Sequence, residues 1–453
     1  MITPKERRKR VFQLAMPAVS EQILNTTVGL MDVLLVGRLP AAAAAVLGYG
    51  SATALAATGL ANEMYWTTIL LFMAIGTGCT ALTARAKGAH DREMGNEALR
   101  QGLLMGIAAA ILMTIVVFYG SYTMMSVYRA DETVTALGAR VLTILSYALV
   151  PTAIGMIGMA AMRGAGDTRT PLYIMIAVNI INVGLSYLLI GGSFGMTPLG
   201  VEGAAVGAAV ARTVGAIATL VVLLRGRAGL HLNQWLSPVG DMMRRITRVG
   251  LPFAGEQAVF QGALMVFLGM VTQLGTDAYA AHNVVIRIES LSFLPGWGYG
   301  IAASALVGQA LGAKKPEEAQ AATTEAFKQT SLIMIVLGGI MVLIPGFLLR
   351  LFIFDEAVVQ AGIVPLQIAG VFQIGMGANF VYSGALRGAG DTKWPLYTKI
   401  IATWGLRLPI SYLMLRWGYG LNGVWVAMGL DFFIQAALAY VRFRQGQWRS
   451  MQV

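Results

Sequence analysis

Charged side chains inside long apolar stretches are the residues of this 453-residue chain that most need a chemical explanation. A charge in the middle of a bilayer is costly unless it is paired or hydrated, so each one is a functional candidate. The charged residues of the apolar stretches are Glu21, Asp32, Glu63, Arg212, Glu256, Arg287, Glu289, Arg407 and Asp431.

The first apolar stretch carries a polar stripe. Glu21, Asn25 and Asp32 are spaced by four and seven residues, which places them on one face of a helix. Each acid of this stripe is a functional candidate, and we interpret Asp32 as functional in preference to a merely hydrogen-bonded structural acid.

A second stripe is formed by Asn179, Asn182 and Ser186 in a stretch otherwise built of Ile, Val and Leu. A carboxylate that faces neutral oxygens suits Na⁺, whereas a desolvated carboxylate suits reversible protonation. We therefore predict a cation-coupling site made of Asp32, Asn179, Asn182 and Ser186, in which Asp32 and Asn182 are the metal ligands if the cation is Na⁺. Amides also join membrane helices without any ligand, and this alternative stays open for Asn182.

The composition indicates which elements position these side chains. Hydrophobic residues make up 57% of the chain and charged residues 12%, against about 25% charged in a soluble domain. A soluble globule is excluded, and the alternating strands of a membrane barrel are not found. The sequence predicts an all-α polytopic membrane protein with twelve transmembrane helices in two pseudo-symmetric six-helix lobes. The predicted helices are 11–37, 60–84, 97–121, 134–160, 170–192, 200–224, 246–273, 280–306, 322–348, 357–384, 394–416 and 422–443.

Basic residues are distributed unevenly between the two ends of these helices. If the N-terminus is cytoplasmic, only Arg38, Arg129, Arg350 and Arg416 fall on the opposite side. This positive-inside pattern explains the net charge of +11 better than nucleic-acid binding does. We predict a multi-pass protein of the prokaryotic cytoplasmic membrane with both termini in the cytoplasm. The single cysteine, Cys79, excludes a disulfide framework.

An internal repeat organises the chain. Residues 162–173 (MRGAGDTRTPLY) and 386–397 (LRGAGDTKWPLY) share RGAGDT and PLY, and residues 17–22 (PAVSEQ) are echoed by 252–257 (PFAGEQ). Six helices per copy give both copies the same orientation, as in the parallel repeats of secondary transporters. The predicted division is an N-terminal lobe (1–224), a cytoplasmic linker (225–245) and a C-terminal lobe (246–453). The RGAGDT segments lack the P-loop lysine and a preceding strand, so nucleotide hydrolysis is not expected.

The repeat also aligns Glu63 with Arg287, because the two positions are separated by the same interval as the RGAGDT segments. We predict that these opposite charges pair across a substrate cleft when its outer side is closed, directly or through Glu289. The alternative is that each pairs within its own lobe. Glu21 and Glu256 follow prolines near the cytoplasmic ends. They are candidates for the same cleft, together with Asn25, or for hydrogen bonds inside each lobe.

Several of these features resemble the multidrug and toxic compound extrusion (MATE) transporters. The resemblance rests on Met31–Leu39 (MDVLLVGRL), the two RGAGDT segments, Ala303–Gly312 (ASALVGQALG) and the six-plus-six duplication. It implies export of bulky, often cationic organic compounds through a cleft between two lobes, driven by inward movement of H⁺ or Na⁺. By the same resemblance, Asp32 is the coupling aspartate of the first helix and Asn182 the asparagine of the fifth.

Departures from the family pattern bear on the branch and on the ion. Ser186 stands where many relatives carry a second aspartate, and Ala208 stands at the usual threonine of the sixth helix. The C-terminal carboxylates of the NorM-like branch are missing: Phe260 stands in the seventh helix, and Met376 and Asn379 stand in the tenth helix where that branch has Asp and Gln. The pattern resembles the DinF-like branch, with coupling concentrated in the N-terminal lobe.

The sequence therefore predicts a secondary active antiporter, not an enzyme, that exports organic cations in exchange for H⁺ by alternating access. The alternatives are a Na⁺-coupled antiporter of the same fold, a lipid-linked precursor flippase and a channel. We expect no cofactor beyond the coupling ion H⁺ or Na⁺. The expected partners are the lipid bilayer and small organic cations or amphipathic drugs, with no nucleic acid, and the protein is expected to act as a monomer.

Overall fold

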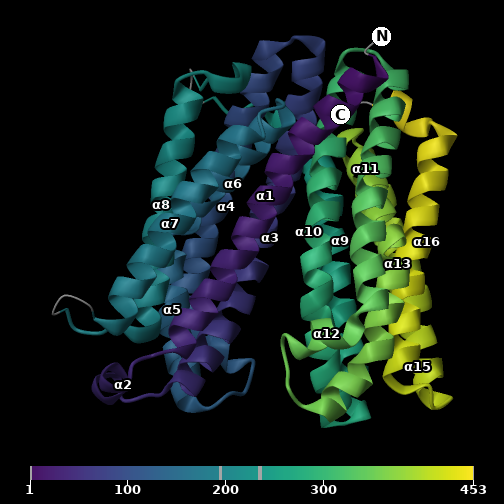
Figure 1. Cartoon of the computed structure of the whole chain (residues 1–453). Helices are drawn as coiled ribbons and strands as arrows, with labels where there is room; N and C mark the ends of the chain where they lie inside the picture. The colour runs from purple at the N-terminus through teal and green to yellow at the C-terminus, as the bar shows by residue number, and fades with distance from the viewer. Residues whose placement is uncertain (1–2, 193–195, 233–236, 452–453) are drawn as a thin grey trace. The chain divides into compact units, whose positions relative to one another are not determined.

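The structure is a computed structural model that describes residues 3–192, 196–232 and 237–451, and it is built of helices (Figure 1). This confirms the predicted all-α fold. The longer elements are α1 (Pro4–Gly37), α2 (Ala41–Leu47), α3 (Ser51–Ala89), α4 (Arg92–Ser126), α5 (Glu132–Ser146), α6 (Leu149–Gly164), α7 (Arg169–Gly191), α8 (Gly200–Leu224), α9 (Gly240–Val271), α10 (Thr276–Gly312), α11 (Pro316–Leu343), α12 (Pro345–Arg350), α13 (Glu356–Gly388), α14 (Lys393–Lys399), the π-helix η4 (Ile400–Arg407), α15 (Leu408–Arg416) and α16 (Gly420–Gln445). The short 3₁₀ helices are η2 (Arg227–Gly229), η3 (Thr272–Leu274) and η5 (Gln447–Ser450).

Each predicted membrane segment has a helical counterpart. Within the described residues, nine helices are long and apolar enough to cross a bilayer, and the bent pair of α5 and α6 adds a tenth. The 37-residue α10 and the consecutive α14, η4 and α15 occupy the two remaining predicted segments. The PAVSEQ and PFAGEQ segments are 235 residues apart and the RGAGDT segments 224, so the first repeat is longer by eleven residues. These extra residues lie around 40–50, where the structure has the short helix α2.

Three predicted helices are broken, and each break lies next to a proline. The segment 134–160 bends by 56° between α5 and α6, just before Pro151. The segment 322–348 ends at Leu343 because Pro345 starts α12. The segment 394–416 contains the π-helix η4 immediately before Pro409. Proline cannot donate the helical hydrogen bond and clashes with the preceding turn, which gives each interruption a local physical cause.

Contacts divide the chain into two compact units. Unit 1 contains residues 1–19, 80–91 and 248–453, and unit 2 contains residues 20–79 and 92–247. The first helix of each repeat therefore contributes to both units: α1 changes unit close to Pro17, and α9 close to Pro252. The predicted division into two lobes and a linker follows the sequence repeat instead and stays a prediction, and residues 233–236 of that linker lie outside the described residues.

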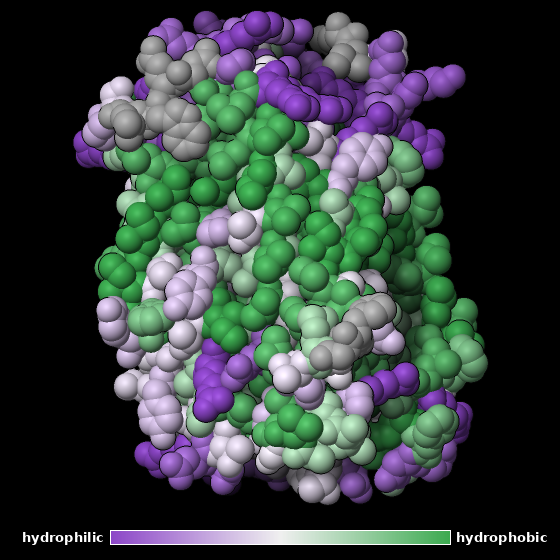
Figure 2. All heavy atoms as spheres, turned by 90° about the vertical axis from the view of Figure 1, so that its left-hand side faces the viewer, coloured by the Kyte–Doolittle hydropathy of each residue, from purple (hydrophilic) through white to green (hydrophobic). Residues whose placement is uncertain are grey.

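Unit 2 has its own apolar core. It is formed by side chains of α3, α4, α5, α6 and α8, with Phe72, Met125 and Leu142 fully buried. In contrast, α7 and α8 expose large apolar side chains, among them Ile180 and Ile217. Figure 2 shows this side of the molecule as a broad apolar belt between polar rims. Such a belt is expected where helices face lipid.

Unit 1 is built around α10 and α13, which pack against α11 and α16. The start of α1 belongs to this unit: Arg10 lies 3.5 Å from Glu318, at the beginning of α11. The C-terminal η5 reaches the same place, since Arg449 donates a 2.6 Å hydrogen bond to Gln320. The first and last described elements therefore lie at one end of unit 1 (Figure 1).

Candidate functional site

Asp32 of α1 and Asn182 of α7 are brought together in unit 2. The amide nitrogen of Asn182 donates to both carboxylate oxygens of Asp32, at 3.2 Å each. Asn182 is 4% exposed, whereas Asp32 is half-buried. The contact links the first and fifth helices of the first repeat through an ionisable group.

The remaining α7 residues of the predicted coupling site are buried beside this contact, on the same helix. Asn179 and Ser186 are buried, and Asn179 Nδ2, Asn182 Oδ1 and Ser186 Oγ have no hydrogen-bond partner among the described residues. A buried polar atom without a partner costs about 1–3 kcal/mol, so such a row indicates a place for water or a bound ion. Two of the three atoms are oxygens that could ligate Na⁺ beside the Asp32 carboxylate.

Arg212 of α8 is a charge near Asp32 that the predicted site did not include. It interacts electrostatically with Asp32, but its guanidinium lies over the ring of Tyr65, 4.5 Å from the centroid. Tyr65 is held in turn by a 2.9 Å hydrogen bond to Thr152. Arg212 therefore balances the charge of Asp32 at a distance and does not form an ion pair with it within the described contacts. The sequence had marked Arg212 only as a charged residue inside an apolar helix, without indicating its neighbour.

Glu21, Asn25 and Asp32 of α1 have three different environments. Glu21 is buried and forms a 2.8 Å ion pair with Arg163 of α6. Asn25 is exposed, and only Asp32 contacts α7. A shared helix face is therefore compatible with separate partners, because neighbouring helices cross α1 at different heights.

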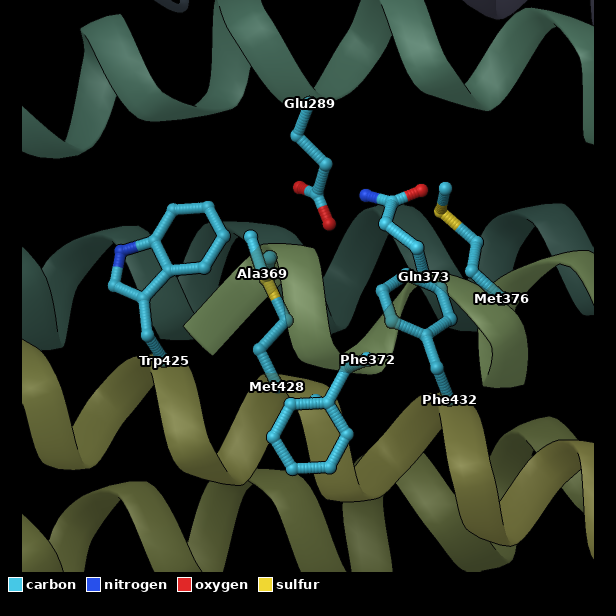
Figure 3. A pocket seen from close by; sticks show the side chains of 9 residues that line it. Glu289, Ala369, Phe372, Gln373, Met376, Trp425, Met428 and Phe432 are labelled. Carbon is cyan, nitrogen blue, oxygen red and sulfur yellow. The ribbon is translucent and has the colours of Figure 1, made fainter. Parts of the chain in front are cut away.

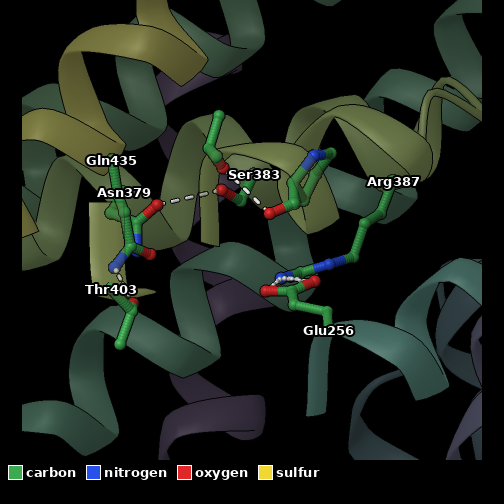
Figure 4. Close-up of polar contacts among 8 residues, drawn as sticks. Glu256, Asn379, Ser383, Arg387, Thr403 and Gln435 are labelled. Atoms are coloured by element: carbon green, nitrogen blue, oxygen red, sulfur yellow. Dashed lines mark hydrogen bonds and ion pairs between the residues drawn. The ribbon is translucent and has the colours of Figure 1, made fainter. Parts of the chain in front are cut away.

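The ion pair of Glu21 has a counterpart in unit 1. Arg387 of α13 donates to both oxygens of Glu256 of α9, at 2.8 and 3.0 Å (Figure 4). Glu256 is the repeat equivalent of Glu21, and Arg387 that of Arg163. The RGAGDT arginine thus performs one structural task in both repeats, which is to fix the first helix to the fourth.

Removing one partner of this repeated ion pair should be strongly destabilising. We expect R163A to lower the free energy of unfolding by about 3–5 kcal/mol, because Glu21 would stay buried without a counter-charge. Denaturation of the purified protein measures the loss. The swapped double variant E21R/R163E should recover much of the stability, and R129A is a matched surface control. Equal stability of R163A and wild type would show that the pair is not structural.

Glu63 and Arg287 are both exposed, in unit 2 and unit 1 respectively. Glu63 lies near the loop after α4, since burial and then the charge of Glu63 raise the pKa of Tyr128. Neither residue forms an ion pair among the described contacts. Their predicted pairing stays a prediction.

Glu289 is half-buried on α10 and lines a pocket closed by α13 and α16 (Figure 3). Gln373 and Trp425 line the same pocket, and each is 1% exposed. The second repeat therefore places a carboxyl group among membrane helices, well separated in sequence from the coupling site of the first repeat.

A polar network in unit 1 is absent from the predicted site. Asp431 of α16 accepts hydrogen bonds from Gln435 at 2.6 Å and from Thr403 at 3.1 Å, and Arg407 lies 3.7 Å from it. The network continues from Gln435 through Asn379 to Ser383; Figure 4 shows the part from Thr403 to Ser383. The sequence signal was present, because Thr403 and Arg407, and likewise Asp431 and Gln435, are four residues apart on helices of apolar segments.

Groups of three or more His, Cys, Asp or Glu side chains that could hold a metal ion do not occur in the part of the chain that the structure describes. The polar sites rely instead on single carboxyl groups with amide and hydroxyl neighbours. Acids of this kind among duplicated membrane helices define the class of protein: a multi-pass, all-helical membrane transporter.

Comparison with known proteins identifies the family. The MatE family profile matches residues 17–188 and 252–413, one block in each repeat. The "Probable multidrug resistance protein NorM" of Thermotoga maritima is 30% identical and aligns over 99% of this chain and 96% of its own. The protein of the same name in Rhodopseudomonas palustris is 28% identical over 95% and 90%. The chain therefore belongs to the MatE family of transporters.

Solved structures support the fold. A structure described as the outward-facing conformation of a multidrug resistance MATE family transporter superimposes with a TM-score of 0.89. The alignment covers 98% of this chain and 97% of that one, at 21% sequence identity. At this identity the structural similarity shows the twelve-helix fold. The transported substrate and the coupling ion have to be inferred from other observations.

Proposed function

We propose that the protein exports organic, cationic compounds in exchange for H⁺ by alternating access, that is, multidrug efflux. The observation that carries the proposal is the contact of Asp32 with Asn182, an ionisable carboxyl group held between two membrane helices. The relatives named as multidrug resistance proteins support the substrate class. The bacterial relatives and the distribution of basic residues support a place in the cytoplasmic membrane with both termini in the cytoplasm.

The local geometry accommodates both charge states of Asp32. As a carboxylate, Asp32 accepts from the amide nitrogen of Asn182. Once protonated it becomes a donor, and Asn182 Oδ1, which lacks a partner among the described residues, becomes its acceptor after rotation of the amide. Protonation would also remove the charge that Arg212 balances. A proton therefore changes the interaction of α1 with both α7 and α8.

Na⁺ is the alternative coupling ion. Asn182 Oδ1 and Ser186 Oγ are available oxygens in the same unit as Asp32. We favour H⁺ because Ser186 and Ala208 replace an acidic and a hydroxyl side chain of the family pattern, which leaves few ligands for a metal ion. The same departures support assignment to the DinF-like branch.

Transport in proteoliposomes distinguishes these ions. We expect efflux of a fluorescent organic cation to follow an imposed pH gradient in sodium-free buffer. A Na⁺ gradient, with the pH gradient collapsed by an ionophore, should drive no transport. The reverse result would assign Na⁺ as the coupling ion, and lack of transport under either gradient, with binding also absent, would argue against the proposed function.

We further propose that Glu63 and Arg287 form an outer gate in part of the transport cycle. The support is their equivalent position in the two repeats, their opposite charge and their exposure. We expect E63R and R287E each to impair transport and the combined charge swap to restore a substantial part of it. Independent, additive losses in the double-mutant cycle would exclude a direct pair.

A further inference from the structure

Glu289 is an acid of a membrane helix in unit 1 whose side chain has no hydrogen bond or ion pair among the described residues. Its side chain enters a pocket whose walls are mostly apolar, with Phe372 and Met376 from α13 and Trp425, Met428 and Phe432 from α16 (Figure 3). Among the described residues, no donor forms a hydrogen bond with its carboxyl group. Only the backbone carbonyl oxygen of Glu289 accepts one in this part of the structure, from the hydroxyl group of Ser292. An unpaired carboxylate in such a site is unfavourable.

Two other acids among the membrane helices of this unit have close charged or polar partners. Glu256 is paired with Arg387. Asp431 is held by Gln435 and Thr403, with Arg407 at 3.7 Å. The second repeat also lacks the acid of the first: the position equivalent to Asp32, counted from the PAVSEQ and PFAGEQ segments, is Phe267.

Arg407 is the cation that acts on Glu289, but its guanidinium is engaged elsewhere. It lies 4.0 Å from the centre of the Phe267 ring and interacts with both Asp431 and Glu289. Its Nε is buried and has no hydrogen-bond partner among the described residues. Arg407 therefore gives long-range compensation to Glu289 and no direct hydrogen bond.

Two buried polar side chains line the pocket without complete hydrogen bonding. Gln373 Oε1 and Trp425 Nε1 have no partner in the described part of the chain, although each residue is 1% exposed. The amide of Gln373 lies next to the carboxyl group of Glu289, with its nitrogen on the near side and its oxygen on the far side (Figure 3). Turning the amide over by 180° would bring Gln373 Oε1 to the carboxyl group of Glu289. Both groups then lack a donor, and a proton on the carboxyl group supplies the one hydrogen that they need.

We propose that Glu289 and Gln373 form a second proton-binding site, located in the C-terminal repeat. The proton binds a carboxyl oxygen of Glu289, which then donates a hydrogen bond to Gln373 Oε1, and it returns to solvent when the site opens. The charged and titratable groups around the site are Arg407 of η4, Asp431 of α16 and His282, which is buried two turns earlier on α10. Each repeat would then carry one proton site: Asp32 in the first and Glu289 in the second.

Infrared difference spectroscopy of the full-length protein tests this site without any transport assay. Wild-type protein titrated through the neutral range is expected to show the carbonyl band of a protonated carboxyl group. E289Q should lose the component of the band that comes from Glu289, keep the component from Asp32, and remain folded. E289D should retain a component from the C-terminal site, and Q373L should shift it, because the acceptor is gone. E356Q is the matched control, since Glu356 is an exposed acid paired with Arg350 outside the membrane helices.

The proposal is overturned if E289Q and wild type have the same carboxyl spectrum, or if Q373L leaves the Glu289 band unmoved. The site also rests in part on the proposed antiport, because a coupled proton needs a transport cycle. The site and the antiport can fail separately. A Glu289 band without proton-driven transport would keep the site and reject H⁺ antiport. Proton-driven transport with unchanged stoichiometry in E289Q, and no Glu289 band in the wild type, would reject only the site.

Discussion

Replacing Asp32 by asparagine is expected to reduce proton-driven export to the level of empty liposomes while the protein stays folded. The amide has nearly the same shape as the carboxyl group and can still bond to Asn182, which now contacts both Asp32 oxygens. It cannot bind or release a proton in the physiological range. Transport of a fluorescent cation under a pH gradient measures the effect, and thermal unfolding reports the fold.

Two further variants separate the charge of Asp32 from its packing. D32E keeps a titratable group one methylene further from the helix and should retain partial transport. N182L removes the hydrogen-bond partner and leaves the acid, so it should alter the pH dependence of transport more than its maximal rate. Full proton-driven activity in D32N would remove Asp32 from the mechanism, whatever the other two variants do.

The sequence predicted the elements that membrane burial controls. Long apolar segments must form helices in lipid, and some ends were predicted closely, as with 200–224 and α8. Others were not: the predicted 60–84 is the longer α3, Ser51–Ala89, because the helix continues beyond its apolar part. Interruptions were harder to predict, because proline is tolerated in membrane helices. Pro17 and Pro252 remain inside continuous helices, whereas Pro345 starts a new one.

The candidate sites were predicted in part. The stripes containing Asp32 and Asn182 meet, since each is the polar face of an apolar helix. The spacing of polar residues along one helix did not show that Glu21 pairs with Arg163, because that contact depends on the crossing of α1 with α6. It also did not connect Arg407 with Asp431, which lie on consecutive but separate helices. Partner choice between helices is set by tertiary packing, and the spacing within one helix contains little of that information.

The duplicated glycines at the ends of α3 and α10 offer a test of how closely the two repeats must approach. Gly88 of α3 and Gly312 of α10 are equivalent in the repeat. A Cβ atom on Gly88 would overlap the backbone oxygen of Gln309, and one on Gly312 would overlap that of Arg85. The contact is therefore reciprocal, backbone against backbone, within unit 1.

Arg85 reinforces the same junction. Its guanidinium donates to the carbonyl oxygens of Ala389, in the second RGAGDT segment, at 3.0 Å and of Met451 at 2.6 Å. The end of α3 is thus attached to the second repeat and to the C-terminal tail. Because the proposed transport cycle requires the substrate site to open toward the cytoplasm, this junction is a contact that the cycle has to break and re-form.

We expect G88A and G312A each to destabilise the purified protein by about 1–3 kcal/mol, the usual range for overpacking, because backbone atoms rather than flexible side chains would have to move. Both should lower transport by favouring the separated arrangement of the two helix ends. A distance measured between spin labels on Lys87 and Lys314 should increase in either variant. The matched control is G339A on α11, where a Cβ meets nothing within 4 Å and alanine should be neutral or stabilising. If G88A and G339A behaved alike in stability, transport and label distance, the close crossing of α3 and α10 would have no part in the cycle.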